Sequence, residues 1–240
     1  MLPFVVPQPE HMKTIGMLGG MSWESTALYY RLANELVRDR LGGLESADLL
    51  VRSVNFALVR DLQVQGRWDD AAELLLREAQ TLEAAGAGLL VLCTNYMHKT
   101  ALTLEAELGV PFLHIADVAA QAATALGVTC IGLTGAAATM AESFYTERLK
   151  THGLKVLVPG HTDRERLDTA IFQELCRGVL SDNTRAALRG VLARLVRQGA
   201  EAIVLGCTEL ELLLGPDDCA VPLLPTARLH VQAAVNIALD

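Results

Sequence analysis

Short apolar runs alternate with longer amphipathic segments along the chain. Runs such as residues 89–92 (LLVL) are typical of buried strands, whereas residues 68–85 carry an apolar stripe at helical spacing. Strands separated by helices indicate parallel pairing with helices on both faces, so the predicted fold class is α/β. The predicted strands are 14–18, 49–56, 89–92, 129–133, 155–158 and 203–205, and the predicted helices are 22–40, 68–85, 97–108, 117–126, 142–152, 163–179 and 184–198.

Two segments of the chain repeat. Residues 86–95 (GAGLLVLCTN) recur as 199–208 (GAEAIVLGCT), at an offset of 199 − 86 = 113. Residues 14–19 (TIGMLG) recur as 130–135 (CIGLTG), at an offset of 130 − 14 = 116. Two matches at nearly the same offset favour two similar parallel-sheet lobes related by a pseudo-twofold axis, with the active site in the cleft between them.

The repeat also predicts how the chain divides. We expect residues 12–113 together with 224–240 to form the first lobe, and residues 114–223 to form the second. Residues 1–11 contain three prolines and no basic segment, so we interpret them as a tail rather than a secretory signal.

Thr94 and Cys207 occupy equivalent positions in the repeat, each just after a buried strand. Because ligands bind beyond the carboxyl ends of parallel strands, both side chains are expected to face the cleft. Cys93 is one residue out of register, and successive strand side chains point to opposite faces, so it is expected to be a core thiol. A thiol opposite a second proton-bearing group suits removal of a proton from one face of a carbon and its return on the other, which inverts a stereocentre.

Composition narrows the possible functions. The chain has 240 residues, 51% of them apolar, and a net charge of 20 − 28 = −8. The negative charge argues against non-specific binding of nucleic acid, and no apolar run approaches the roughly 18 residues of a membrane-spanning helix. The five cysteines lack Cys-x-x-Cys spacing, which argues against a thiolate zinc site and a disulfide framework and favours a cytoplasmic protein.

Three motifs resemble the aspartate/glutamate racemase family of PLP-independent enzymes, which also includes hydantoin racemases, maleate isomerases and arylmalonate decarboxylases. They are residues 13–22 (KTIGMLGGMS), 94–98 (TNYMH) and 206–209 (GCTE), and the resemblance covers nearly the whole chain from Met12. The first catalytic motif of the family is usually Cys-Asn-Thr-x-His, so Thr94 and Tyr96 are departures. A bacterial subset specific for L-aspartate and L-glutamate also carries Leu-Cys-Thr-Asn here, and the chain is most similar to that subset.

The resemblance implies a racemase of aspartate or glutamate without cofactor or metal, with Cys207 as the thiolate base and Thr94 as its partner. Backbone N–H groups of residues 20–22 and 135–137 are expected to bind the substrate carboxylate. A distal carboxylate needs a cation, for which Arg166 is expected and Arg60 and Arg164 are alternatives. Besides the amino acid, the expected partner is a second copy in a homodimer. The substrate-binding residues implied are Met21, Ser22, Gln63, Asn95, Tyr96, Gly135, Ala136, Arg166 and Thr208.

Other functions stay open at this point. Arylmalonate decarboxylases also keep only the second cysteine, so a lyase is the nearest alternative, and a cation in the cleft would argue against it. A broad-specificity amino-acid racemase and a non-catalytic ligand binder are the others. His98 is either a core or a supporting histidine, and Glu209 is interpreted as a supporting residue rather than a base. The remaining thiols, at Cys130, Cys176 and Cys219, are interpreted as packing residues.

Overall fold

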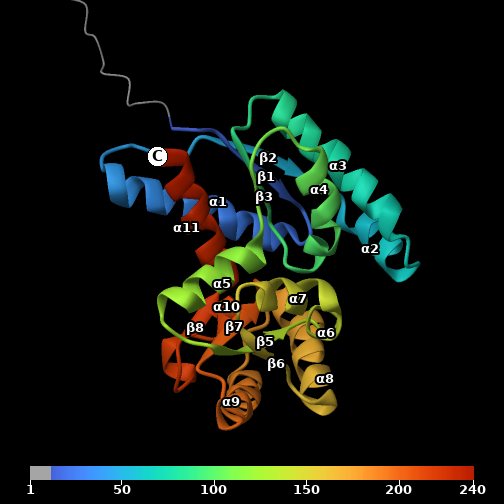
Figure 1. Cartoon of the computed structure of the whole chain (residues 1–240), viewed down its shortest axis with the longest axis vertical. Coiled ribbons are helices and arrows are strands. Elements are labelled where there is room, and N and C mark those ends of the chain that lie inside the picture. Colours follow the sequence, from blue (N-terminus) through green and yellow to red (C-terminus); the bar gives the residue numbers. More distant parts are fainter. Residues whose placement is uncertain (1–11) are drawn as a thin grey trace, which may run out of the picture.

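Two parallel sheets of four strands each form the framework, in the orders β2-β1-β3-β4 and β6-β5-β7-β8. The computed structural model describes residues 12–240, so the expected tail at residues 1–11 lies outside the described residues. Figure 1 shows the two sheets in separate lobes, each with its own helices. Every strand pairs in parallel with its neighbours, which confirms the predicted two-lobe α/β fold.

The first lobe contains β1 (Ile15–Gly19), α1 (Trp23–Leu41), β2 (Leu49–Ser53), α2 (Phe56–Val64), α3 (Trp68–Ala84), β3 (Leu89–Leu92), the 3₁₀ turn η1 (Tyr96–Thr100), α4 (Ala101–Glu107) and β4 (Phe112–Leu113). The second lobe contains α5 (Ile115–Ala125), β5 (Cys130–Gly135), α6 (Ala137–Ala141), α7 (Ser143–Thr151), β6 (Lys155–Leu157), α8 (His161–Thr169), the π turn η2 (Ala170–Glu174), the 3₁₀ turn η3 (Leu175–Arg177), α9 (Asp182–Arg197), β7 (Ala202–Gly206), α10 (Leu210–Leu213), the 3₁₀ turn η4 (Pro216–Asp218) and β8 (Leu223–Pro225). The last helix is α11 (Thr226–Leu239).

Alternate side chains of β3 face two different layers of helices. Leu89, Val91 and the following Cys93 pack with residues of α1 and α11. Leu90 and Leu92 pack on the opposite side with residues of α2, α3 and α4. This alternation follows from the two-residue period of a strand, and it confirms that Cys93 is a fully buried core thiol.

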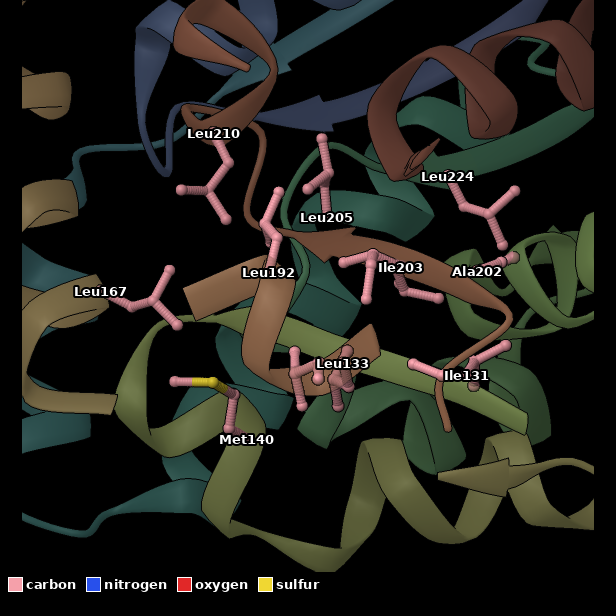
Figure 2. Packing of buried hydrophobic residues seen from close by; sticks show 14 of the residues in the cluster. Ile131, Leu133, Met140, Leu167, Leu192, Ala202, Ile203, Leu205, Leu210 and Leu224 are labelled. Carbon is pink, nitrogen blue, oxygen red and sulfur yellow. The ribbon is translucent and has the colours of Figure 1, made fainter. Parts of the chain in front are cut away.

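The second lobe has one large apolar core built around β5 and β7. Figure 2 shows Ile131 and Leu133 of β5 beside Ile203 and Leu205 of β7, with Leu192 of α9 among them. Side chains of α5, α7 and α8 complete this core. Both lobes therefore hold their central strands by the same helix-on-sheet packing.

The chain crosses between the lobes near its end. β8 pairs with β7 in the second lobe, so the expected division at residue 224 falls inside a strand. The following helix α11 buries Ala227, Val231 and Val235 in the first-lobe core and also contacts α5 of the second lobe. α11 and α5 thus connect the two lobes by packing (Figure 1).

Several elements differ from the expected pattern. The strand expected at 49–56 ends at Ser53, because Asn55 starts α2 by accepting a hydrogen bond from the Ala57 N–H (3.0 Å). The helix expected at 163–179 breaks into α8, a π turn and a 3₁₀ turn, which ends at Gly178 in a left-handed conformation (φ 73°). The pattern also did not predict α2, α6, α10, α11, β4 or β8, and of these α6, α10, β4 and β8 are too short for a clear period.

Candidate active site

One cavity of about 300 Å³ lies at the carboxyl ends of both sheets. The segments that line it follow β1, β3, β5 and β7, with further side chains from α2, α8, η2 and η3. Four strand ends meet there because the two inner strands of each sheet point their carboxyl ends toward the opposite lobe. The cavity therefore occupies the predicted cleft.

Thr94 and Cys207 both line this cavity, one from each lobe. The backbone carbonyl of Thr94 accepts a hydrogen bond from His98 Nδ1 (2.7 Å), and His98 Nε2 accepts one from the Ile115 N–H (3.2 Å). These partners fix one neutral tautomer of His98. Burial, together with the nearby His114 and His230, lowers the pKa of His98 well below its usual range. His98 therefore supports the Thr94 backbone as an uncharged group.

The Cys207 thiol lies in a different setting. Its Sγ is 3.0 Å from Oε2 of Glu209 and donates a hydrogen bond to it. Burial and the negative charge of Glu209 raise the pKa of Cys207 well above its usual range. The neighbouring carboxylate therefore disfavours the thiolate form of Cys207. Both causes favour the protonated thiol over the thiolate.

Glu209 links the two lobes behind Cys207. Its carboxylate is 6% exposed, and Oε1 accepts hydrogen bonds from the hydroxyls of Ser22 (3.0 Å) and Ser25 (3.2 Å) at the start of α1. Oε2 accepts a further bond from the Thr208 hydroxyl (2.8 Å). Counting Cys207, four donors satisfy this buried carboxylate. Glu209 therefore acts as a fixed acceptor beside the thiol, consistent with a supporting role.

Most of the predicted site residues come together in the cavity, and two do not. Those that line it are Met21, Ser22, Gln63, Thr94, Asn95, Tyr96, Ala136, Cys207 and Thr208. Gly135 is not part of the lining: a Cβ there would lie 2.7 Å from the Gly206 carbonyl oxygen, so this glycine permits the close approach of β5 and β7. Arg166 lies in a separate surface depression, with its side chain 55% exposed and paired to Asp163 (3.3 Å).

The cation of the cavity is Arg60 rather than Arg166. Among the lining residues within 12–240, Arg60 of α2 is the one lysine or arginine. Its Nη1 donates to Gln63 Oε1 (3.1 Å), and its guanidinium carbon lies 5.7 Å from the ring centroid of Phe172 in the second lobe. Arg164 does not line the cavity. The structure does not bring Arg166 to the cavity, because α8 turns that side chain toward solvent and Asp163.

Some groups that were expected to bind the substrate already form hydrogen bonds with other residues of the protein. The Ala137 N–H donates to Asp168 Oδ1 (2.9 Å). The amide of Asn95 donates to the Thr226 hydroxyl (3.0 Å) and accepts from the Tyr145 hydroxyl (2.9 Å), so it ties together segments of both lobes. These groups shape the cavity walls, and fewer donors than expected are available for a ligand.

The sequence reasoning missed three polar groups of the cavity, which are Thr139, Asp168 and Cys176. Thr139 is 1% exposed, and its hydroxyl has no hydrogen-bond partner within residues 12–240. Cys176 also lines the cavity, where burial and Glu209 raise its pKa to about 12. The signal for Thr139 is its place just beyond the carboxyl end of β5. Cys176 follows an irregular turn that no pattern reveals.

Further structural surveys cover the described residues only. Over residues 12–240, no helix is long and apolar enough to cross a membrane. In the same range, no group of three or more His, Cys, Asp or Glu side chains is arranged to hold a metal ion. The expectations of no metal and no cofactor stay predictions.

A cavity between two similar α/β lobes, with a thiol and a hydroxyl from opposite sides, suits an enzyme that moves a proton at a carbon centre. The sequence profile of the Asp/Glu/hydantoin racemase family matches residues 18–234, and the chain belongs to this family. It is therefore an isomerase of the racemase type.

Solved structures agree with this assignment. A Yersinia pestis protein described as a candidate Asp/Glu racemase is 45% identical with a TM-score of 0.90, covering 95% of this chain and 100% of that one. An aspartate racemase homologue from Pyrococcus horikoshii is 32% identical with a TM-score of 0.86 at the same coverage. The aspartate racemase of Picrophilus torridus is 15% identical over 94% of each chain, with a TM-score of 0.74, and shows likeness of fold alone.

Proposed function

We propose that the protein racemises aspartate or glutamate without PLP, using Cys207 and Thr94. The observation that carries the proposal is that these two side chains, at repeat-equivalent positions in opposite lobes, line one cavity. An amino acid bound between them would present one face of Cα to each group. The names of the similar proteins support the substrate class.

In the proposed reaction, Cys207 removes the α-proton of the L-enantiomer and Thr94 delivers a proton to the other face. Cys207 must first lose its own proton, and Glu209 Oε2 is an acceptor within 3.0 Å. The carbanion is then protonated by the Thr94 hydroxyl, directly or through water, and that hydroxyl recovers a proton from water. Transfer in the D-to-L direction runs the same steps backwards.

Arg60 supports an acidic substrate. A guanidinium binds a carboxylate with two parallel hydrogen bonds, and Arg60 is the one basic side chain lining the cavity within residues 12–240. The same cation argues against an arylmalonate-decarboxylase-like lyase, whose substrate has no distal carboxylate. A broad-specificity racemase would tolerate substrates that leave Arg60 unpaired.

Proton NMR of a panel of L- and D-amino acids in D₂O tests the proposal. We expect the α-proton signals of aspartate or glutamate to disappear with enzyme, and a chiral assay to show both enantiomers. Loss of signal across many side chains would favour the broad-specificity racemase. If no amino acid exchanges its α-proton, the proposed function is wrong. The homodimer and the cytoplasmic location also stay proposals, and sedimentation velocity tests the first.

A further inference from the structure

A carboxylate of the second lobe binds two side chains of the first lobe beside the cavity. Glu142 lies between α6 and α7, and its Oε1 accepts a hydrogen bond from the Tyr96 hydroxyl (2.9 Å). Its Oε2 pairs with the ammonium group of Lys99. Tyr96 and Lys99 both belong to η1, which contacts α7 across the gap between the lobes. The carboxylate therefore joins the lobes through both of its oxygens.

Aromatic rings hold the two first-lobe side chains in place. The Tyr96 ring meets Trp68 edge to face (centroids 5.3 Å apart) and tilts against Phe144 of α7 (6.1 Å). The Lys99 ammonium lies 3.9 Å from the Trp68 ring centroid, within cation–π distance. Trp68 of the first lobe thus orients both donors, so they lose little further conformational entropy when they bind Glu142.

Only one member of this group touches the cavity. Tyr96 is a lining residue, whereas Lys99 and Glu142 are not. Burial and the hydrogen bond to Glu142 raise the pKa of Tyr96 well above its usual range, so its phenol stays a neutral donor. Glu142 can affect a ligand only through Tyr96 and through the closure of the lobes.

We propose that Glu142 is a positioning residue that holds the lobes closed over the substrate through Tyr96 and Lys99. We call these three residues the latch. The proposal rests on the proposed function, since it concerns the same cavity. A site that binds substrate only in its closed state has an apparent affinity proportional to the fraction of molecules in that state. Removing the latch should therefore raise KM more than it lowers kcat.

A second ion pair between the lobes provides a matched control. Arg148 of α7 donates to Glu105 of α4 (2.8 and 3.2 Å) and also pairs with Asp117 of its own lobe. Neither Arg148 nor Glu105 lines the cavity. The substitution Glu105→Ala removes a contact between the lobes without touching the latch.

The kinetic test compares Glu142→Ala, Tyr96→Phe and the double variant. We expect Glu142→Ala to raise KM by about 3- to 10-fold with kcat nearly unchanged, as for loss of a half-buried charged pair. Tyr96→Phe should raise KM less, because Lys99 still binds Glu142. In the Glu142→Ala background, Tyr96→Phe should add nothing. Additive effects of the two substitutions, or a Glu142→Ala KM equal to that of Glu105→Ala, would overturn the proposal.

A spectroscopic test does not depend on activity. The chain has two tryptophans, so Trp23→Phe leaves Trp68 of the latch region as the sole tryptophan. We expect Glu142→Ala to increase acrylamide quenching of Trp68 without any ligand, and Glu105→Ala to leave it unchanged. Unchanged quenching in Glu142→Ala rejects the latch even in an active racemase. Increased quenching supports it even if the NMR panel rejects the proposed function.

Discussion

Thr94 and Cys207 occupy equivalent places in the two lobes, yet different groups stand behind them. Four residues after Thr94 comes His98, a buried neutral histidine that binds the Thr94 carbonyl. The matching position after Cys207 (98 + 113 = 211) is Glu211, and Glu209 lies closer still to the thiol. The first lobe therefore places a neutral histidine behind the backbone of Thr94, whereas the second places a carboxylate beside its thiol.

In the proposed reaction, this difference gives the two ends of the cavity separate tasks. An acceptor at 3.0 Å lets the Cys207 side take up and store a proton. The Thr94 side has a hydroxyl with a neutral histidine behind its backbone, which suits passing a proton rather than holding one. A duplicated fold can thus keep two similar backbones while the strand-end residues of its two lobes take different chemical roles.

Removing the thiol should have the largest effect. We expect Cys207→Ala to lower kcat/KM for racemisation by about 10²- to 10⁴-fold or more, since it deletes the proposed base. The matched control is Cys93→Ala, which removes a fully buried thiol outside the cavity and should change kcat/KM by about twofold at most. A chiral assay of both variants measures this. Equal losses in the two variants would mean that Cys207 has no special role.

Removing the cavity cation should have an intermediate effect. We expect Arg60→Met to raise KM for aspartate or glutamate by about 10- to 100-fold, the value of a lost charge-assisted hydrogen-bond pair. Arg166→Met, which alters a residue outside the cavity, serves as the control and should leave KM unchanged. Steady-state kinetics with both variants decide between the two arginines. The opposite pattern would restore Arg166 as the substrate cation.

Glu211 is expected to affect stability rather than activity. Its carboxylate accepts a hydrogen bond from the Ala227 N–H at the start of α11 (2.7 Å), and burial raises its pKa from 4.5 to about 7. A raised carboxyl pKa means that the folded state binds more protons than the unfolded state between these values. The contribution of Glu211 to the free energy of unfolding is therefore fully present below pH 4.5 and is lost as the pH rises to about 7. The loss is on the order of 3 kcal/mol.

Urea unfolding of the wild type and Glu211→Gln across this range checks the sign. Gln keeps an oxygen acceptor for Ala227 but carries no charge. We expect the variant to gain stability relative to the wild type as pH rises from 5 to 8. A difference that stays constant with pH would contradict the raised pKa.

The sequence predicted the parts of the site that depend on local pattern. Thr94 and Cys207 follow buried apolar strands, so the repeat alone was enough to bring them to one cavity. The sequence could not tell which arginine lines the cavity, because Arg60 and Arg166 both lie on helices and only the packed positions of α2 and α8 decide which one faces it. The raised pKa of Cys207 was also out of reach, because it depends on Glu209, whose donors Ser22 and Ser25 come from the other lobe.

The division of tasks between the two ends is tested most directly by Thr94→Ala with L-aspartate or L-glutamate in D₂O. Cys207 alone can remove the α-proton, exchange it with solvent and return deuterium to the same face. The account predicts loss of the α-proton signal by NMR while the amino acid remains L in a chiral assay. Racemisation at the wild-type rate, or loss of both exchange and racemisation, would contradict it.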